Sequence, residues 1–127
     1  MYTDPISDLL TRLRNAANAN HDTVYVPYSK LKENILKVMK NAKFIKDFEK
    51  EEEKNSKPQI VVTLFENRLL TLKRMSSPGQ RLYIKKENIK VTKGGLGVVI
   101  LSTSKGVMPA TEAKKLNIGG ELICEIY

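Results

Sequence analysis

The sequence is poor in the side chains that bind metals and form disulfides. It contains one cysteine, Cys124, and one histidine, His21, in 127 residues. A single cysteine excludes an intramolecular disulfide and a cysteine-based zinc site, and a lone histidine argues against a metal centre or a catalytic triad. Cys124 alternates with Leu122 and Ile126, so we interpret it as a core thiol. We therefore expect neither a metal nor a cofactor.

Long apolar segments are also missing. The longest apolar run, residues 96–101, includes Gly97 and is far too short for a membrane span. The first residues, Met1 to Pro5, lack the basic start and apolar stretch of a signal peptide. The sequence thus predicts a soluble, cytoplasmic protein with no membrane partner.

Arrangements of residues typical of catalysis are scarce as well. Ser104 and Lys105 could form a nucleophile pair, but adjacent residues in an extended segment usually point apart. Neighbouring carboxylates occur in Glu51–Glu53, a polar loop that provides no pocket. We expect that the chain is not an enzyme. The alternative is an enzyme that acts on a phosphorylated small molecule beside Ser102–Ser104, which requires a concave pocket and a catalytic pair.

Positive charge is what the sequence has in excess. Lysine and arginine number 22 against 14 acidic residues, which gives a formal net charge of +8. A field of this sign attracts polyanions, and nucleic acid is the commonest of them. A basic soluble enzyme is the alternative interpretation. The acidic run Glu51–Glu53 would repel phosphate, so we expect its loop to point away from any RNA.

The first half of the chain has the pattern of two helices and three strands. Asp4 and Pro5 are a capping residue and a first helical residue, and apolar side chains recur at helical spacing up to about residues 18–20. Ser29 can cap a second helix with a lysine-rich outer face. Strands are predicted from β-branched and aromatic content at 23–26, 44–49 and 59–65, with a further extended segment at 69–75.

The second half is mainly extended. A break at Ser76–Gly79 precedes a predicted strand at 81–84, a glycine-rich turn at 94–97 and a central strand at 98–101. Pro109 can start a short helix that runs to Leu116 and is ended by Gly119–Gly120, before a closing strand at 121–127. The fold class is therefore α+β: an N-terminal α/β module, with two helices against a three-stranded sheet, packed on a smaller, mainly β C-terminal domain with one short helix. We place the domains at 1–70 and 71–127, to within about six residues.

Two turns of the second half carry the chemistry of a binding site. Three consecutive hydroxyl residues, Ser102–Ser104, are followed by Lys105 and Gly106. Hydroxyl groups donate and accept hydrogen bonds, which suits ribose 2′-hydroxyls and base edges, while a lysine neutralises phosphate. The second turn is Gly119–Gly120 with Glu121, whose carboxylate can accept hydrogen bonds from base amino groups. On chemistry alone such a hydroxyl segment is more often an ordinary loop.

Several of these segments together resemble a known family, the bacterial small-subunit ribosomal protein number eight. The resemblance covers essentially the whole chain. It is carried by the following segments: Asp4–Asn15, Val26–Lys32, Ser77–Gly79 with Arg81 and Tyr83, Ser102–Met108 with Glu112–Ala113, and Gly119–Glu121 with Cys124.

The resemblance implies a primary RNA-binding protein that contacts the central domain of 16S rRNA and helps to assemble the platform of the small subunit. It implies an RNA contact through the C-terminal domain and a smaller contribution from the N-terminal one. The residues so implied are Ser102, Thr103, Ser104, Lys105, Gly120, Glu121, Tyr83, Thr3, Asp4 and Lys30.

Further partners follow from the same resemblance. Small-subunit proteins numbers five and twelve are the expected protein neighbours, and no homo-oligomer is expected. The family also implies a second role, repression of its own operon through a messenger RNA that imitates the ribosomal site. A free regulator of messenger RNA is therefore the alternative to a ribosomal constituent.

Overall fold

The computed structural model describes residues 4–89 and 97–127. Within these residues the chain forms three α-helices, one 3₁₀ turn and eight strands. They are α1 (Pro5–Asn18), β1 (Thr23–Pro27), α2 (Lys30–Asn41), β2 (Asp47–Glu51), β3 (Gln59–Thr63), β4 (Leu72–Arg74), β5 (Tyr83–Ile84), η1 (Lys86–Asn88), β6 (Val98–Thr103), β7 (Gly106–Pro109), α3 (Ala110–Lys115) and β8 (Gly120–Ile126). Thr3 and positions 94–96 of the predicted glycine-rich turn lie outside the described residues.

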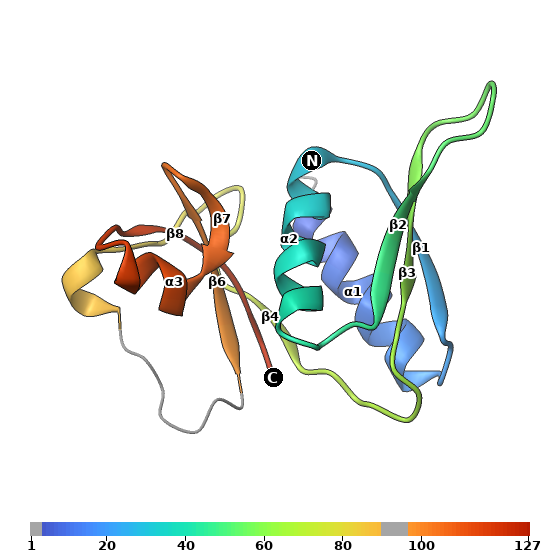
Figure 1. Ribbon diagram of the computed structural model, residues 1–127, viewed down its shortest axis with the longest axis horizontal. Coiled ribbons are helices and arrows are strands. Elements are labelled where there is room, and N and C mark those ends of the chain that lie inside the picture. Colours follow the sequence, from blue (N-terminus) through green and yellow to red (C-terminus); the bar gives the residue numbers. More distant parts are fainter. Residues whose placement is uncertain (1–3, 90–96) are drawn as a thin grey trace.

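The first half is a three-stranded antiparallel sheet with α1 and α2 on one face (Figure 1). Its strand order is β1-β3-β2, and Val24, Val62 and Phe48 form one row across it. The two predicted caps form, because the side chains of Asp4 and Ser29 accept hydrogen bonds from backbone N–H groups in the first turns of α1 and α2. The hairpin between β2 and β3 projects on the side away from the second half (Figure 1).

The second half is a five-stranded antiparallel sheet with the last strand at its centre. The order is β4-β8-β6-β7, and β5 also pairs with β8. Strand β7 was not predicted, because the four residues Gly106–Pro109 are too few for an alternating pattern and end in proline. Strand β6 continues past the predicted end at 101 to include Ser102 and Thr103. The first two of the three hydroxyl residues are therefore strand residues.

One apolar cluster joins the two halves. It contains Leu9, Leu10 and Leu13 of α1 together with Ile100 of β6 and Ile126 of β8. The opposite face of the second sheet packs on α3 through a smaller cluster. The α+β class, with an N-terminal module packed on a smaller, mainly β part that carries one short helix, is confirmed. The division into domains at residue 70 stays a prediction, since the larger cluster is continuous across it.

All three α-helices end in the same way, with a non-glycine residue in the left-handed region. These residues are Asn20, Lys43 and Asn117, with φ of 59°, 64° and 61°. Each is followed by an N–H that bonds a carbonyl five residues back, which is the Schellman arrangement. Phe44 is therefore the closing residue of α2, and the strand predicted at 44–49 begins only at Asp47. The end of α3 is likewise made by Asn117, so the prediction that Gly119–Gly120 ends it was wrong.

Candidate nucleic-acid interface

Three of the predicted site residues form a row across neighbouring strands. In the second sheet Tyr83 of β5 lies opposite Glu121 of β8, and Glu121 lies opposite Ser102 of β6. Directly opposed residues of antiparallel strands place their side chains on the same face. That face carries Tyr83 with 67% of its surface exposed, beside the half-buried Glu121 and Ser102. We call Tyr83, Glu121 and Ser102 the recognition row.

The glycine pair sets the spacing of these strands. A Cβ atom on Gly120 would lie 2.4 Å from the carbonyl oxygen of Ser102, and one on Gly119 would lie 2.3 Å from that of Ile84. Neither glycine has a positive φ. The first structural role of the glycine pair is therefore close approach between protein strands, which brings Ser102 and Tyr83 to either side of Glu121.

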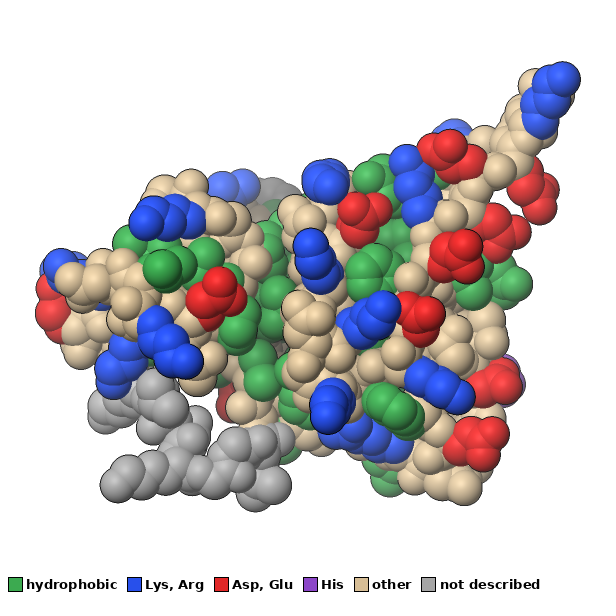
Figure 2. Space-filling view, viewed as in Figure 1, with side chains coloured by type: hydrophobic (Ala, Val, Ile, Leu, Met, Phe, Trp, Pro, Cys, Tyr) green, Lys and Arg blue, Asp and Glu red, His purple; other side chains and the backbone are tan. Residues whose placement is uncertain are grey.

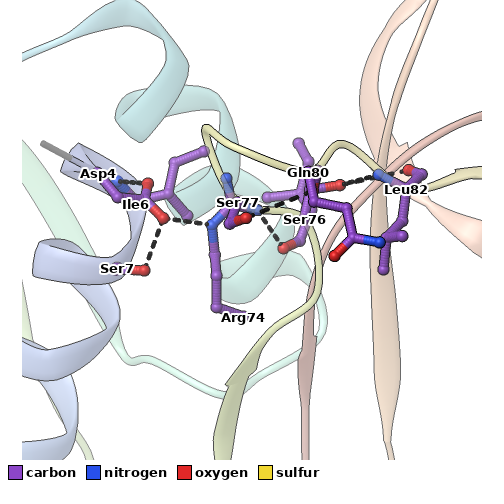
Figure 3. A network of polar contacts seen from close by, with 9 residues as sticks. Asp4, Ile6, Ser7, Arg74, Ser76, Ser77, Gln80 and Leu82 are labelled. Atoms are coloured by element: carbon purple, nitrogen blue, oxygen red, sulfur yellow. Dashed lines mark hydrogen bonds and ion pairs between the residues drawn. The ribbon is translucent and has the colours of Figure 1, made fainter. Parts of the chain in front are cut away.

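A tight loop holds Tyr83 in the row. Ser77 and Gln80 exchange backbone hydrogen bonds of 2.9 and 3.1 Å, which confirms the predicted turn at Pro78–Gly79. The side chain of Ser76, 1% exposed, accepts a 2.8 Å bond from the N–H of Leu82 and donates to its carbonyl oxygen at 3.3 Å (Figure 3). Because Leu82 is fixed from both sides, the following residue enters β5 in a defined position.

The three hydroxyl residues Ser102–Ser104 have different structural positions. Ser102 belongs to the recognition row, and Ser104 is exposed at the tip of the β6–β7 hairpin with Lys105. The Thr103 hydroxyl donates to the Gly106 carbonyl oxygen at 2.8 Å and accepts from the Lys105 N–H at 3.1 Å. It therefore closes the turn, and Gly106 completes it with a φ of 115°. A direct RNA contact by Thr103 stays a prediction, with only one lone pair left for it.

A cleft between the two halves lies beside two residues of this row. It has a volume of about 360 Å³ and is lined by Ser102 and Glu121 on one side and by Asp4 and Leu31 on the other. Lys30, which was predicted to contact RNA, starts α2 next to Leu31 and is exposed, with an ion pair of 3.2 Å to Glu33. The structure thus brings the N-terminal candidate Asp4 to the same cleft as Ser102 and Glu121, whereas Lys30 is only the chain neighbour of a lining residue.

Asp4 is held in a polar network that joins α1 to the second sheet (Figure 3). One carboxylate oxygen accepts the N–H of Ile6 at 3.1 Å, and the other accepts the Ser7 hydroxyl at 2.7 Å and the Arg74 Nε–H at 3.0 Å. Arg74 also donates to the Ile123 carbonyl oxygen at 2.6 Å. The side chains of Arg74 and Asp4 are 17% and 16% exposed. Asp4 is therefore first of all a link between the halves.

The same network lowers the pKa of Asp4. Burial by itself raises this pKa, but the hydrogen bonds from Ser7 and Arg74, together with the Arg74 charge, outweigh it, and the pKa falls below its ordinary 3.8. The stabilisation that this carboxylate provides is therefore complete above about pH 4 and is lost as the pH falls through the lowered value.

We predict a matching pH dependence. The stability difference between the wild type and Asp4→Asn should be full at pH 7 and should shrink as the pH is lowered below 4. Urea unfolding of both proteins at pH 7, 4 and 3 measures it. A difference that stays constant over this range would show that the charge of Asp4 contributes nothing.

Two arginines of the cleft were not predicted as site residues. Arg74 and Arg81 both line it, Arg81 on an exposed position that can reach a phosphate. Their signal in the sequence was weak, because Arg81 was noted only among the residues that carry the family resemblance and Arg74 not at all. The important property of Arg74 is its ion pair with Asp4. The two residues are far apart in the chain, so no local pattern reveals the pair.

Charge is distributed unevenly over the molecule. On the face shown in Figure 2, most visible acidic side chains lie at the end with the three-stranded sheet, whereas lysine and arginine extend over α2 and the second half. Glu49, Glu51 and Glu53 are exposed on β2 and in its hairpin. These carboxylates therefore disfavour a polyanion at the end of the molecule that carries β2 and its hairpin.

Other kinds of site are not found in the part of the chain that the structure describes. Its helices are too short and too polar to span a membrane. Residues 4–89 and 97–127 hold no cluster of histidine, cysteine and carboxylate side chains that could bind a metal ion. Burial raises the pKa of the Cys124 thiol to about 12, so this cysteine is an unreactive core residue, as predicted.

Comparison with known proteins identifies one family over nearly the whole chain. The family model described as Ribosomal protein S8 matches residues 4–127. Among curated relatives, the small ribosomal subunit protein uS8 of Desulforudis audaxviator (strain MP104C) is 47% identical over 131 residues, covering 100% of both chains. That of Acholeplasma laidlawii (strain PG-8A) is 48% identical over 132 residues, covering 100% of this chain and 99% of the relative.

A third relative extends the range of organisms. The protein uS8 of Anaeromyxobacter sp. (strain Fw109-5) is 45% identical over 133 residues, which cover 99% of this chain and 98% of the relative. The matches span both halves of the chain, including the cleft, the recognition row and the β6–β7 hairpin. The chain therefore belongs to the ribosomal protein S8 family, and is with it a structural constituent of the small ribosomal subunit.

Proposed function

We propose that this protein binds directly to the central domain of 16S rRNA, as a primary binding protein that helps to assemble the platform of the small subunit. The observation that carries the proposal is the recognition row, which aligns a tyrosine, a carboxylate and a hydroxyl on one face beside a cleft that Arg74 and Arg81 also line. Membership of the family supports association with 16S rRNA in general. The central domain is what the family resemblance implies.

The row suits a distorted RNA helix. The Ser102 hydroxyl can donate to or accept from a ribose 2′-hydroxyl, and Glu121 can accept from a base amino group or a ribose hydroxyl. Tyr83 is exposed enough for its ring to stack on an unstacked base. Lys105 at the hairpin tip and Lys30 at the exposed start of α2 supply sequence-independent attraction to phosphates.

The cleft beside Ser102 does not by itself favour the enzyme alternative. The enzyme alternative required a concave pocket next to the hydroxyl residues, and a cleft lined by Ser102 does exist. Ser104 and Lys105, the pair considered for it, lie at the exposed tip of the hairpin instead of in the cleft. Members of the family are structural components of the ribosome, so the expectation that the chain is not an enzyme is confirmed by its family.

Removal of the carboxylate or the hydroxyl of the row provides the test. We expect Glu121→Ala and Ser102→Ala each to weaken binding to a central-domain fragment of 16S rRNA by about tenfold, since a lost hydrogen bond to a charged or buried group costs this much. Unfolding curves should stay close to the wild type. Filter binding at fixed salt measures the affinity.

A matched control is Glu49→Ala, which removes a carboxylate from the exposed face of β2. This variant should bind the fragment at least as well as the wild type, because it removes a repulsive charge far from the row. Equal affinities for all four proteins would contradict the proposed surface. If only Glu49→Ala lost binding, the RNA would bind at β2 and not at the recognition row.

The recognition row is also the surface we assign to the second role, binding to the messenger RNA of its own operon. One site for two RNAs predicts that they compete. Sedimentation of a cell extract separates the alternatives, since a ribosomal constituent cofractionates with small subunits and a free regulator does not. We assign the contacts with small-subunit proteins numbers five and twelve to the acidic end of the molecule, because we do not expect RNA to bind there.

A further inference from the structure

A second cleft lies on the other side of the β6–β7 hairpin. It has a volume of about 540 Å³ and is formed by α2 and β7, with a wall from the start of α3. Asn34 and Asn41 line it from one side of α2, with Lys37 between them. We call it the α2–β7 cleft. None of its polar residues is among those that the family resemblance implies as RNA contacts.

The floor of this cleft is apolar and its rim is polar. Val38 of α2, 7% exposed, and the half-buried Val107 of β7 are apolar side chains of the lining. Asn34 and Asn41 form no side-chain hydrogen bond with any other described residue, so their amides are free to bind a ligand. Glu112 on the opposite wall adds a carboxylate acceptor. An apolar floor with a few polar groups is the usual make-up of a site for a small planar ligand.

The α2–β7 cleft and the recognition row both adjoin the β6–β7 hairpin. Ser102 of the row lies directly opposite Val107, so both side chains are on the face of the sheet that meets the N-terminal half. Gly106, next to the tip residues, also lines the cleft. RNA that is bound at the recognition row can therefore reach the cleft around the exposed tip of the β6–β7 hairpin.

We propose that the α2–β7 cleft takes one unpaired adenine nucleotide of the RNA that binds at the recognition row. An asparagine amide matches adenine with two hydrogen bonds, and Glu112 can accept from the exocyclic amino group. The valines cover the face of the base, and Lys37 at the rim is placed to neutralise its phosphate. Unpaired bases that are turned out of a helix are the usual targets of RNA-binding pockets. This inference rests on the proposed function.

The experiment measures the effect of two asparagine substitutions in the protein together with single changes in the RNA. Asn34→Ala and Asn41→Ala are combined in one variant, which keeps α2 helical because alanine is the best helix former. The RNA is the central-domain fragment, in which each unpaired nucleotide is replaced in turn by an abasic one. Asn15→Ala, which removes an exposed amide from α1, is the matched control.

We expect the double variant to bind the intact fragment about tenfold more weakly than the wild type, within the range for one bidentate base contact. One abasic position should weaken the wild type by the same factor and should have no further effect on the double variant, because both changes remove the same contact. The Asn15→Ala protein should behave like the wild type at every position.

Two results would overturn the inference. The first is that no abasic position is coupled to the asparagines. The second is that the double variant binds the free fragment like the wild type but is retained less well in small subunits, which would show that a neighbouring protein fills the cleft. Failure of the proposed function is distinguishable from both, since the wild type would then not bind the fragment at all.

Discussion

Asp4→Ala is expected to lower the free energy of unfolding by about 3 kcal/mol, an estimate that combines the loss of a helix cap with the loss of a mostly buried ion pair. The carboxylate caps α1 and at the same time neutralises Arg74, whose side chain is 17% exposed. Without it the guanidinium keeps its bond to the Ile123 carbonyl oxygen but loses its counter-charge. Urea unfolding at pH 7 measures the effect.

Comparison with Asp4→Asn separates the two contributions. An asparagine can still cap the helix, so this variant should recover about 1 kcal/mol and lose the rest with the ion pair. RNA affinity should fall in both variants, because the network fixes one wall of the cleft against the other. If Asp4→Ala unfolded like the wild type but bound RNA weakly, the residue would be a direct RNA contact and the network of little energetic importance.

The second large effect is expected for Gly120→Ala. Its Cβ would lie 2.4 Å from the Ser102 carbonyl oxygen and 3.0 Å from Thr103 Cγ2, so β8 must move away from β6. Such crowding typically costs about 2 kcal/mol. The displacement falls within the recognition row, and we therefore expect RNA affinity to drop by about tenfold as well, as for the loss of a row contact. Unfolding and filter binding on the same sample measure both.

Gly79→Ala is the control for this substitution. A Cβ at Gly79 meets no heavy atom within 4 Å, and its φ is not positive. The change should leave stability within about 0.5 kcal/mol or raise it slightly, by restricting the unfolded chain. If Gly120→Ala matched this control in stability and in binding, the spacing of β8 and β6 would not depend on a missing side chain.

Local patterns in the sequence predicted the elements whose causes are local. The caps at Asp4 and Ser29, the turn at Pro78–Gly79 and the buried Cys124 all follow from residues within a few positions of one another. The predicted strand at 44–49 was wrong at its start because Lys43, a residue with no special preference for it, takes the left-handed conformation that ends α2. Nothing in the local pattern distinguishes that lysine from its neighbours.

The candidate site shows the same division. The hydroxyl run and the glycine–glutamate turn were visible in the sequence, and the family resemblance connected them. The recognition row was not, because it depends on the register of three strands, with Tyr83, Glu121 and Ser102 far apart in the chain. The pairing of Asp4 with Arg74 is similarly non-local, which is why Asp4 was predicted as an RNA contact without its structural role.

The central position of β8 has a consequence for folding during translation. This strand ends at Ile126, yet it pairs with β4, β5 and β6. The three-stranded sheet can form from residues up to Thr63 while translation continues, but the second sheet lacks its middle strand until β8 has emerged from the ribosome that makes it. We therefore expect that a nascent chain cannot bind RNA through its recognition row before β8 has been made.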